Sequence, residues 1–151
     1  MKQIIFTVIL ILAFSVAAFA QEEMPEFRCG VPFDSFGKLH QYDLYARLDN
    51  FFVALLNDPT AKGFVKLKLN KNENKARKIK QLNEISKHLS ARKFDRTRIT
   101  FAIFEVDEKY TTLYVAPQQA SIKDVVFENE NYKVIKGEEF DQKIKELFPK
   151  K

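Results

Sequence analysis

The chain of 151 residues carries 25 Lys and Arg against 20 Asp and Glu, a formal net charge of +5, and 46% of it is apolar. This length and apolar content fit one domain with a hydrophobic core and exclude a chain that is disordered throughout. Only four glycines and one cysteine are present, which excludes a disulfide-rich scaffold and leaves little material for a glycine-rich phosphate loop.

The first 20 residues have the pattern of a secretory leader. Lys2 supplies a positive start, an apolar run extends from Ile4 to about Leu12, and Ala18 and Ala20 frame an A-x-A cleavage site. The alternative, a transmembrane anchor, needs about 20 apolar residues. Cleavage after Ala20 would leave 131 residues, and because only Lys2 is lost among charged residues, the net charge would fall to +4. We therefore predict an exported protein, periplasmic or extracellular, with no transmembrane anchor after cleavage.

Residues 21–32 contain two prolines and little periodicity, which is typical of a flexible lead-in. Cys29 lies in this segment, where it could form an intermolecular disulfide, act as a reactive thiol or stay unpaired. Together with His40 and His88 it offers too few ligands for a His/Cys zinc site. We predict neither a metal nor a cofactor.

Periodicity predicts the elements of the first half. Residues 31–39 form a short edge strand or an ordered loop. A helix follows over 44–56, with its apolar positions on one face, Asp43 as N-cap or first-turn acid, and N-D-P at its end. Residues 63–69 alternate between apolar and lysine positions, which predicts a strand with one buried and one solvated face.

A second amphipathic helix is predicted over about 75–91. Two strands, 98–106 and 111–116, are expected to pair as an antiparallel hairpin. A second hairpin is expected between 125–127 and 132–135, and residues 138–148 have the apolar spacing of a helix. The chain is thus predicted to be α+β.

Several motifs carry a resemblance. F-D-S-F (33–36), A-R-L-D (46–49) and L-L-N-D-P (55–59) resemble, in order and spacing, the opening of OmpA-like C-terminal domains, and F-D-R-T-R-I (94–99) is similar to the turn and strand that follow the second helix in that family. The longer forms F-D-S-F-G, A-R-L-D-N-F and N-D-P-T-A-K-G-F also resemble a group of secreted, uncharacterised bacterial proteins. The resemblance implies a βαβαββ two-layer sandwich over 33–117, with 118–151 as an appendage made of a hairpin and an amphipathic helix.

In that family, an aspartate and an arginine clamp the carboxylates of diaminopimelate in peptidoglycan. Here K-L-N-K-N (68–72) occupies the region of the family's G-H-T-D-like segment, and Gln81 and Leu82 occupy the positions of its Arg-Ala pair. Loss of a bidentate guanidinium–carboxylate contact removes geometry as well as charge. The resemblance therefore does not carry peptidoglycan binding over to this chain.

Charge is distributed unevenly. Residues 62–98 hold 13 basic residues against three acids, whereas residues 105–146 hold ten acids against six lysines. The basic stretch could bind an anionic envelope component, or it could be a solvated helix face that keeps the protein soluble. Nucleic acid is not expected, because the protein is predicted to be exported and the stretch has few aromatics. The candidate binding residues are Lys66, Lys68, Lys71, Lys75, Arg77 and Lys78.

No G-x-S-x-G, P-loop or H-E-x-x-H motif occurs, and no catalytic residue is predicted. The expected function is that of an exported, non-catalytic binding or structural module of the cell envelope. Two alternatives stay open. One is a hydrolase that uses scattered carboxylates, and the other is a partner-binding subunit of an envelope complex that uses an exposed strand at 63–69.

Overall fold

The computed structural model describes residues 31–125 and 131–148. Its elements, in chain order, are β1 (Asp34–Phe36), α2 (Gln41–Asn57), β2 (Lys62–Asn70), α3 (Lys75–Ala91), η1 (Arg96–Arg98), β3 (Ile99–Val106), β4 (Tyr110–Ala116), α4 (Ile122–Val125), β5 (Tyr132–Lys136), η2 (Gly137–Glu139) and α5 (Phe140–Leu147). The α+β class is confirmed, and the strands and helices from β1 to β4 follow the predicted order. The predicted leader, the lead-in up to residue 30 and Cys29 lie outside the described residues.

The strands form one mixed sheet in the order β1-β4-β2-β3-β5. β2 pairs with β3 in parallel and with β4 antiparallel. The predicted hairpin of 98–106 with 111–116 is therefore wrong, because β2 lies between these strands. Residues 107–109 pass over the end of β2, which is a step of two strand spacings or about 10 Å. A connection this short is also typical of a hairpin, so its length does not distinguish the two arrangements.

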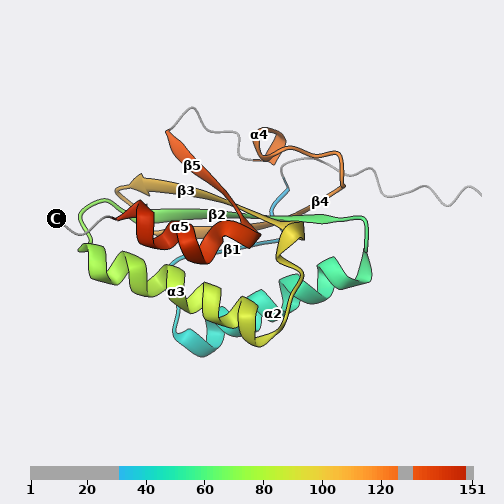
Figure 1. Cartoon of the computed structure of the whole chain (residues 1–151), viewed down its shortest axis with the longest axis horizontal. Coiled ribbons are helices and arrows are strands. Elements are labelled where there is room, and N and C mark those ends of the chain that lie inside the picture. The colour runs from blue at the N-terminus through green and yellow to red at the C-terminus, as the bar shows by residue number, and fades with distance from the viewer. Residues whose placement is uncertain (1–30, 126–130, 149–151) are drawn as a thin grey trace, which may run out of the picture.

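The helices α2, α3 and α5 lie on one face of the sheet (Figure 1). The apolar stripe of α2 is buried there as predicted through Leu55, whereas Leu56 is 62% exposed. From α3, the buried apolar residues are Leu82, Ile85 and Leu89. They pack with β2 and β3 residues such as Val65 in the main core.

The opposite face of the sheet carries a second, smaller core. Phe64, Phe104 and Tyr114 lie in this cluster, and Ala120 and Val125 cover it from the α4 segment. The lysine face of β2 is therefore not solvated as predicted.

Within this face, Lys66 is buried, with its Nζ atom 5.5 Å from the centroid of the Phe104 ring. β2 is also paired along both edges. The strand at 63–69 is thus central, which contradicts its use as an exposed strand for a partner.

The tail belongs to the same sheet. β5 pairs with β3, and Val125 lies in α4. Residues 126–127, the rest of the strand expected to pair with 132–135, lie outside the described residues. The helix predicted over 138–148 is confirmed as η2 and α5. Within the described residues, no helix combines the length and apolar character needed to cross a membrane.

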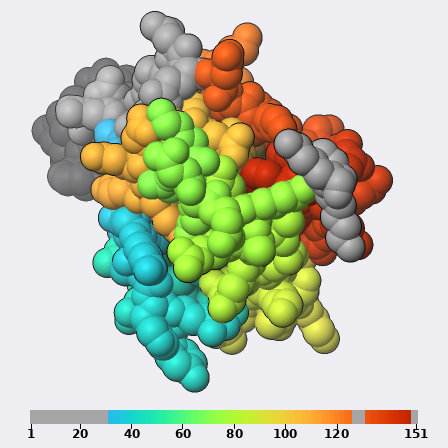
Figure 2. Space-filling model, turned by 90° about the vertical axis from the view of Figure 1, so that its left-hand side faces the viewer, coloured from blue at the N-terminus to red at the C-terminus, as the bar shows by residue number. Residues whose placement is uncertain are grey.

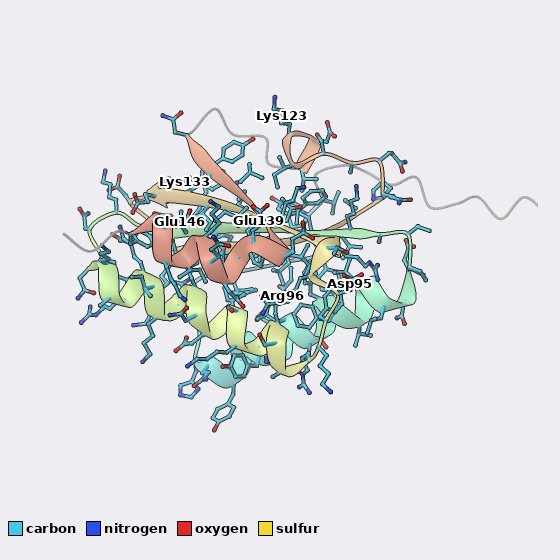
Figure 3. All side chains as sticks on the ribbon, in the orientation of Figure 1. Asp95, Arg96, Lys123, Lys133, Glu139 and Glu146 are labelled. Carbon is cyan, nitrogen blue, oxygen red and sulfur yellow. The ribbon has the colours of Figure 1, made fainter. Side chains whose placement is uncertain are left out.

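Two contacts hold α5 in place. The Phe140 ring stacks on Phe101 with centroids 3.8 Å apart. Asp141 accepts a hydrogen bond from Ser86 on α3 and lies 2.8 Å from the Arg96 guanidinium, which is labelled between α5 and the lower helices in Figure 3. The C-terminal helix is therefore an integral part of the helical layer.

Candidate functional site

The six predicted binding residues do not form one surface. Lys66 and Lys68 lie on β2, on the face opposite the helices, where Lys66 is buried and Lys68 is half-buried. Lys71, Lys75, Arg77 and Lys78 lie in or just before α3, on the helical side. The sheet separates Lys66 from the residues of α3, and only Lys68 and Lys71 meet, at the end of the sheet. A single ligand face therefore cannot include all six.

Two of the remaining lysines are used within the fold. Lys78 is buried, and its Nζ atom lies 2.6 Å from Glu105 Oε1 and 3.2 Å from the carbonyl oxygen of Lys71. Lys71 is exposed and pairs with Asp107 at 2.8 Å. Both amines already have acidic partners. Arg77, in the first turn of α3, is exposed.

A cleft of about 540 Å³ opens where Arg77 lies. Its walls are the β1–α2 loop, the N-terminal half of α3 and the β3–β4 turn, which meet on the face shown in Figure 2. We call it the α3 cleft and define it by its charged and amide-bearing residues Lys38, Gln41, Glu73, Arg77, Lys80, Gln81, Glu84 and Lys109. Four cations face two carboxylates in this set, so the cleft favours an anionic group.

The start of α3 sets which side chains enter the α3 cleft. Asn74 caps the helix, with its side-chain oxygen 2.9 Å from the backbone nitrogen of Arg77. Counted from Arg77, the residues Lys80, Gln81 and Glu84 follow at offsets of three, four and seven. This spacing places all four side chains on one face of the helix.

The opposite wall is held by an ion pair between α2 and β1. Arg47 donates through Nη1 to both carboxylate oxygens of Asp34, at 2.6 and 2.7 Å, and its guanidinium lies 5.3 Å from the Phe36 ring centroid. The loop that carries Lys38 runs directly from β1 to α2. This ion pair therefore fixes both ends of the loop.

Two oxygen atoms in the α3 cleft are buried and accept no hydrogen bond from the described residues. They are Glu73 Oε2 and Gln81 Oε1. The nearest cation to the first is Lys109 Nζ, 3.6 Å away, which is beyond a normal hydrogen bond. Buried acceptors are nearly always paired in native proteins. Glu73 Oε2 has the Lys109 ammonium as its ion-pair partner, and neither oxygen has surface that a ligand in the cleft could reach.

One carboxyl group with a shifted pKa lies between α2 and α3. The pKa of Asp49 on α2 is lowered, chiefly by the hydrogen bond from Arg92. A hydrogen bond with His88 lowers it further, whereas burial of the carboxylate acts in the opposite direction. His88 lies in the last turn of α3, where it is buried and stacked on Tyr45 with centroids 4.2 Å apart. This contact joins α2 to α3 and belongs to the fold.

Sequence reasoning missed three cations of the α3 cleft. Lys80 could have been found from Arg77, one helical turn away. Lys38 and Lys109 come from loops that are distant in sequence, and only the pairing of β1 with β4 brings them together. No pattern in either loop signals this approach.

No group of three or more His, Cys, Asp or Glu residues in the described part of the chain is placed to hold a metal ion. No family model matches the chain, and searches of curated proteins and of solved structures find no match either. The geometry of the α3 cleft is therefore the basis for a functional proposal.

Proposed function

We propose that the protein is an exported, non-catalytic binding module of the cell envelope and that its α3 cleft binds a carboxylate or another anionic group of an envelope component. The observation that carries this proposal is the convergence of Lys38, Arg77, Lys80 and Lys109 from three separate segments on one hollow. If these cations only kept a helix face soluble, they would lie on the helix. Here two loops also bring a cation to the same cleft.

Gln81 lines the α3 cleft together with these cations. The proposed resemblance to OmpA-like domains points to the same place, because Gln81 stands where that family has its clamping arginine. With glutamine there, the bidentate contact to a carboxylate is lost, and the anion would have to be bound by the cations around it.

The hydrolase alternative calls for a pair of carboxyl groups of which one has a raised pKa. In residues 31–125 and 131–148, every carboxyl group with a resolved shift has a lowered pKa, namely Asp49, Asp58, Asp95, Asp124, Asp141 and Glu146. This pattern is typical of hydrogen-bonded and ion-paired carboxylates. It is the reason why we favour binding over catalysis.

The proposal is tested by titrating the purified protein with poly-L-glutamate at low ionic strength. The double variant Arg77→Glu with Lys80→Glu should bind at least about tenfold more weakly, because two attractive contacts become repulsive. The matched control, Lys123→Glu with Lys136→Glu, has the same net charge and changes two exposed lysines outside the cleft. Equal losses in both double variants, or no binding by the unmodified protein, would show that the α3 cleft is not the site.

A further inference from the structure

A second hollow lies beside the α3 cleft, at the end of the sheet. β2 and β3 run parallel and end next to each other, with Asn70 opposite Val106. A hollow of about 820 Å³ opens there, which we call the sheet-end pocket, and its lining includes Lys68, Lys71, Asp107, Glu108 and Tyr110. The carboxyl ends of adjacent parallel strands are a common place for ligands.

The chemistry of the sheet-end pocket differs from that of the α3 cleft. Its lining holds three carboxylates, those of Glu105, Asp107 and Glu108, against two lysines, and the Lys71 amine is already paired with Asp107 at 2.8 Å. Tyr110 is 43% exposed and offers an aromatic surface with a polar tip. Carboxylate oxygens beside an aromatic ring suit a ligand that has many hydroxyl groups and an apolar ring face, which describes a sugar.

One short turn separates the two hollows. Lys109 lines the α3 cleft, whereas its neighbours Glu108 and Tyr110 line the sheet-end pocket. Successive Cα atoms are about 3.8 Å apart, so groups on both sides of this turn lie within reach of one polymer chain. A polymer that carries sugar rings and acidic groups in alternation or on the same units would occupy both hollows.

We propose that the sheet-end pocket binds a sugar ring and that the two hollows together bind an acidic polysaccharide. This inference rests on the proposed function, since the α3 cleft supplies the contact with the acidic group. It adds a second site and names the ligand class. The two claims make separate predictions, because a polyanion without sugars would use the α3 cleft alone.

The test compares polygalacturonate with poly-L-glutamate, which both carry one carboxylate per unit, in titrations of the full protein. We expect tighter binding of polygalacturonate. Tyr110→Ala should weaken the binding of polygalacturonate by about fivefold to tenfold, as expected for loss of an aromatic contact, and should leave poly-L-glutamate unchanged. Tyr110→Phe, which keeps the ring, should retain most of the affinity and controls for folding.

Three outcomes would overturn the inference: equal affinity for the two polymers, an unchanged affinity of Tyr110→Ala for polygalacturonate, or equal losses for both polymers. In each of these cases the α3 cleft could still bind poly-L-glutamate, and the proposed function would stand. Loss of poly-L-glutamate binding only in the Arg77→Glu and Lys80→Glu variant supports the α3 cleft independently. If the unmodified protein binds neither polymer, both proposals fail.

Discussion

His88 Nε2 on α3 lies 2.8 Å from Asp49 Oδ1 on α2, and the same carboxylate accepts hydrogen bonds from Arg92. The imidazole is buried between the rings of Tyr45 and Phe52. A single carboxylate on α2 thus joins the last turn and the end of α3 to the first helix. The α3 cleft begins about one helical turn away, since Leu44 of α2 and Glu84 of α3 line it, and this contact joins the two helices that form its walls.

Asp49→Asn should destabilise the fold in a pH-dependent way. The pKa of Asp49 is lower in the folded state than its unfolded value of about 3.9. Its contribution to the free energy of unfolding is therefore fully present above the unfolded pKa and is lost as the pH falls through the folded pKa. We expect a loss of about 1–2 kcal/mol in the free energy of unfolding at pH 7, measured by denaturant titration. The difference from the unmodified protein should shrink below pH 4, and Glu138→Gln, a surface change, should show neither effect. A loss that is the same at pH 7 and pH 2 would contradict this assignment.

Arg98, which lies in the F-D-R-T-R-I motif, should be a stability residue. Its Nη2 atom donates to the carbonyl oxygens of Asp58 and Ala61, at 2.6 and 2.8 Å, and to that of Leu55 at the end of α2. Arg98→Ala should lower the free energy of unfolding by about 2–3 kcal/mol, since charge-assisted hydrogen bonds to three backbone carbonyls are lost. Arg98→Lys should recover less than half of that, because one ammonium group cannot reach all three oxygens. Chemical denaturation measures both, and a loss below 0.5 kcal/mol for Arg98→Ala, about the size of a surface change, would refute the role.

Gly63 and Gly37 form a matched pair. A Cβ atom at Gly63 would lie 2.6 Å from Phe51 Cζ and 2.8 Å from Leu55 Cδ1, whereas the nearest atom to a Cβ at Gly37 is 3.9 Å away. Gly63→Ala should therefore cost about 1–3 kcal/mol through overpacking, and Gly37→Ala should change the melting temperature little. Thermal unfolding of the two variants compares them directly. Equal melting temperatures would mean that α2 can move away from β2.

Lys78 should contribute to packing and not to ligand binding, although the sequence suggested otherwise. It is buried against Glu105, whose side chain is 53% exposed and can be solvated alone. Lys78→Met should therefore change the free energy of unfolding by less than about 1 kcal/mol and leave the affinity for poly-L-glutamate within about twofold. A tenfold loss of affinity in this variant would restore Lys78 to the binding surface.

The sequence predicted what depends on local periodicity. The end of α2 and the extent of α3 follow from apolar spacing together with the N-D-P stop and Asn74, whereas α2 begins at Gln41, three residues before its predicted start. The class and the order of the elements follow from the same spacing. The pairing of the strands could not be predicted in this way. A run as apolar as Ile99–Phe104 shows that a strand is buried, but it does not show which strands lie beside it. Lys66 was misplaced for a related reason, since alternation predicts a solvated face only if nothing covers it, and the α4 segment covers that face.

The candidate site was predictable only in part. Arg77 was identified from the charge of 62–98, and Lys80 follows it at helical spacing. Lys38 and Lys109 could not be identified from the sequence. They approach each other only because the chain passes over the end of β2 after β3, so that β4 pairs with β1. Charge along the sequence indicated that a basic region exists, whereas the positions of individual side chains decide which members of it share a cleft.

The central claim is that the α3 cleft binds an anionic group, and amide chemical-shift mapping by NMR tests it most directly. Titration of the isotopically labelled protein with a short oligo-L-glutamate at low ionic strength should shift the resonances of Lys38, Arg77, Lys80 and Lys109 and leave those of α4 and β5 in place. The shifts should decrease with added salt. Largest shifts on α4 or β5, or none at any residue of the cleft, would contradict the account.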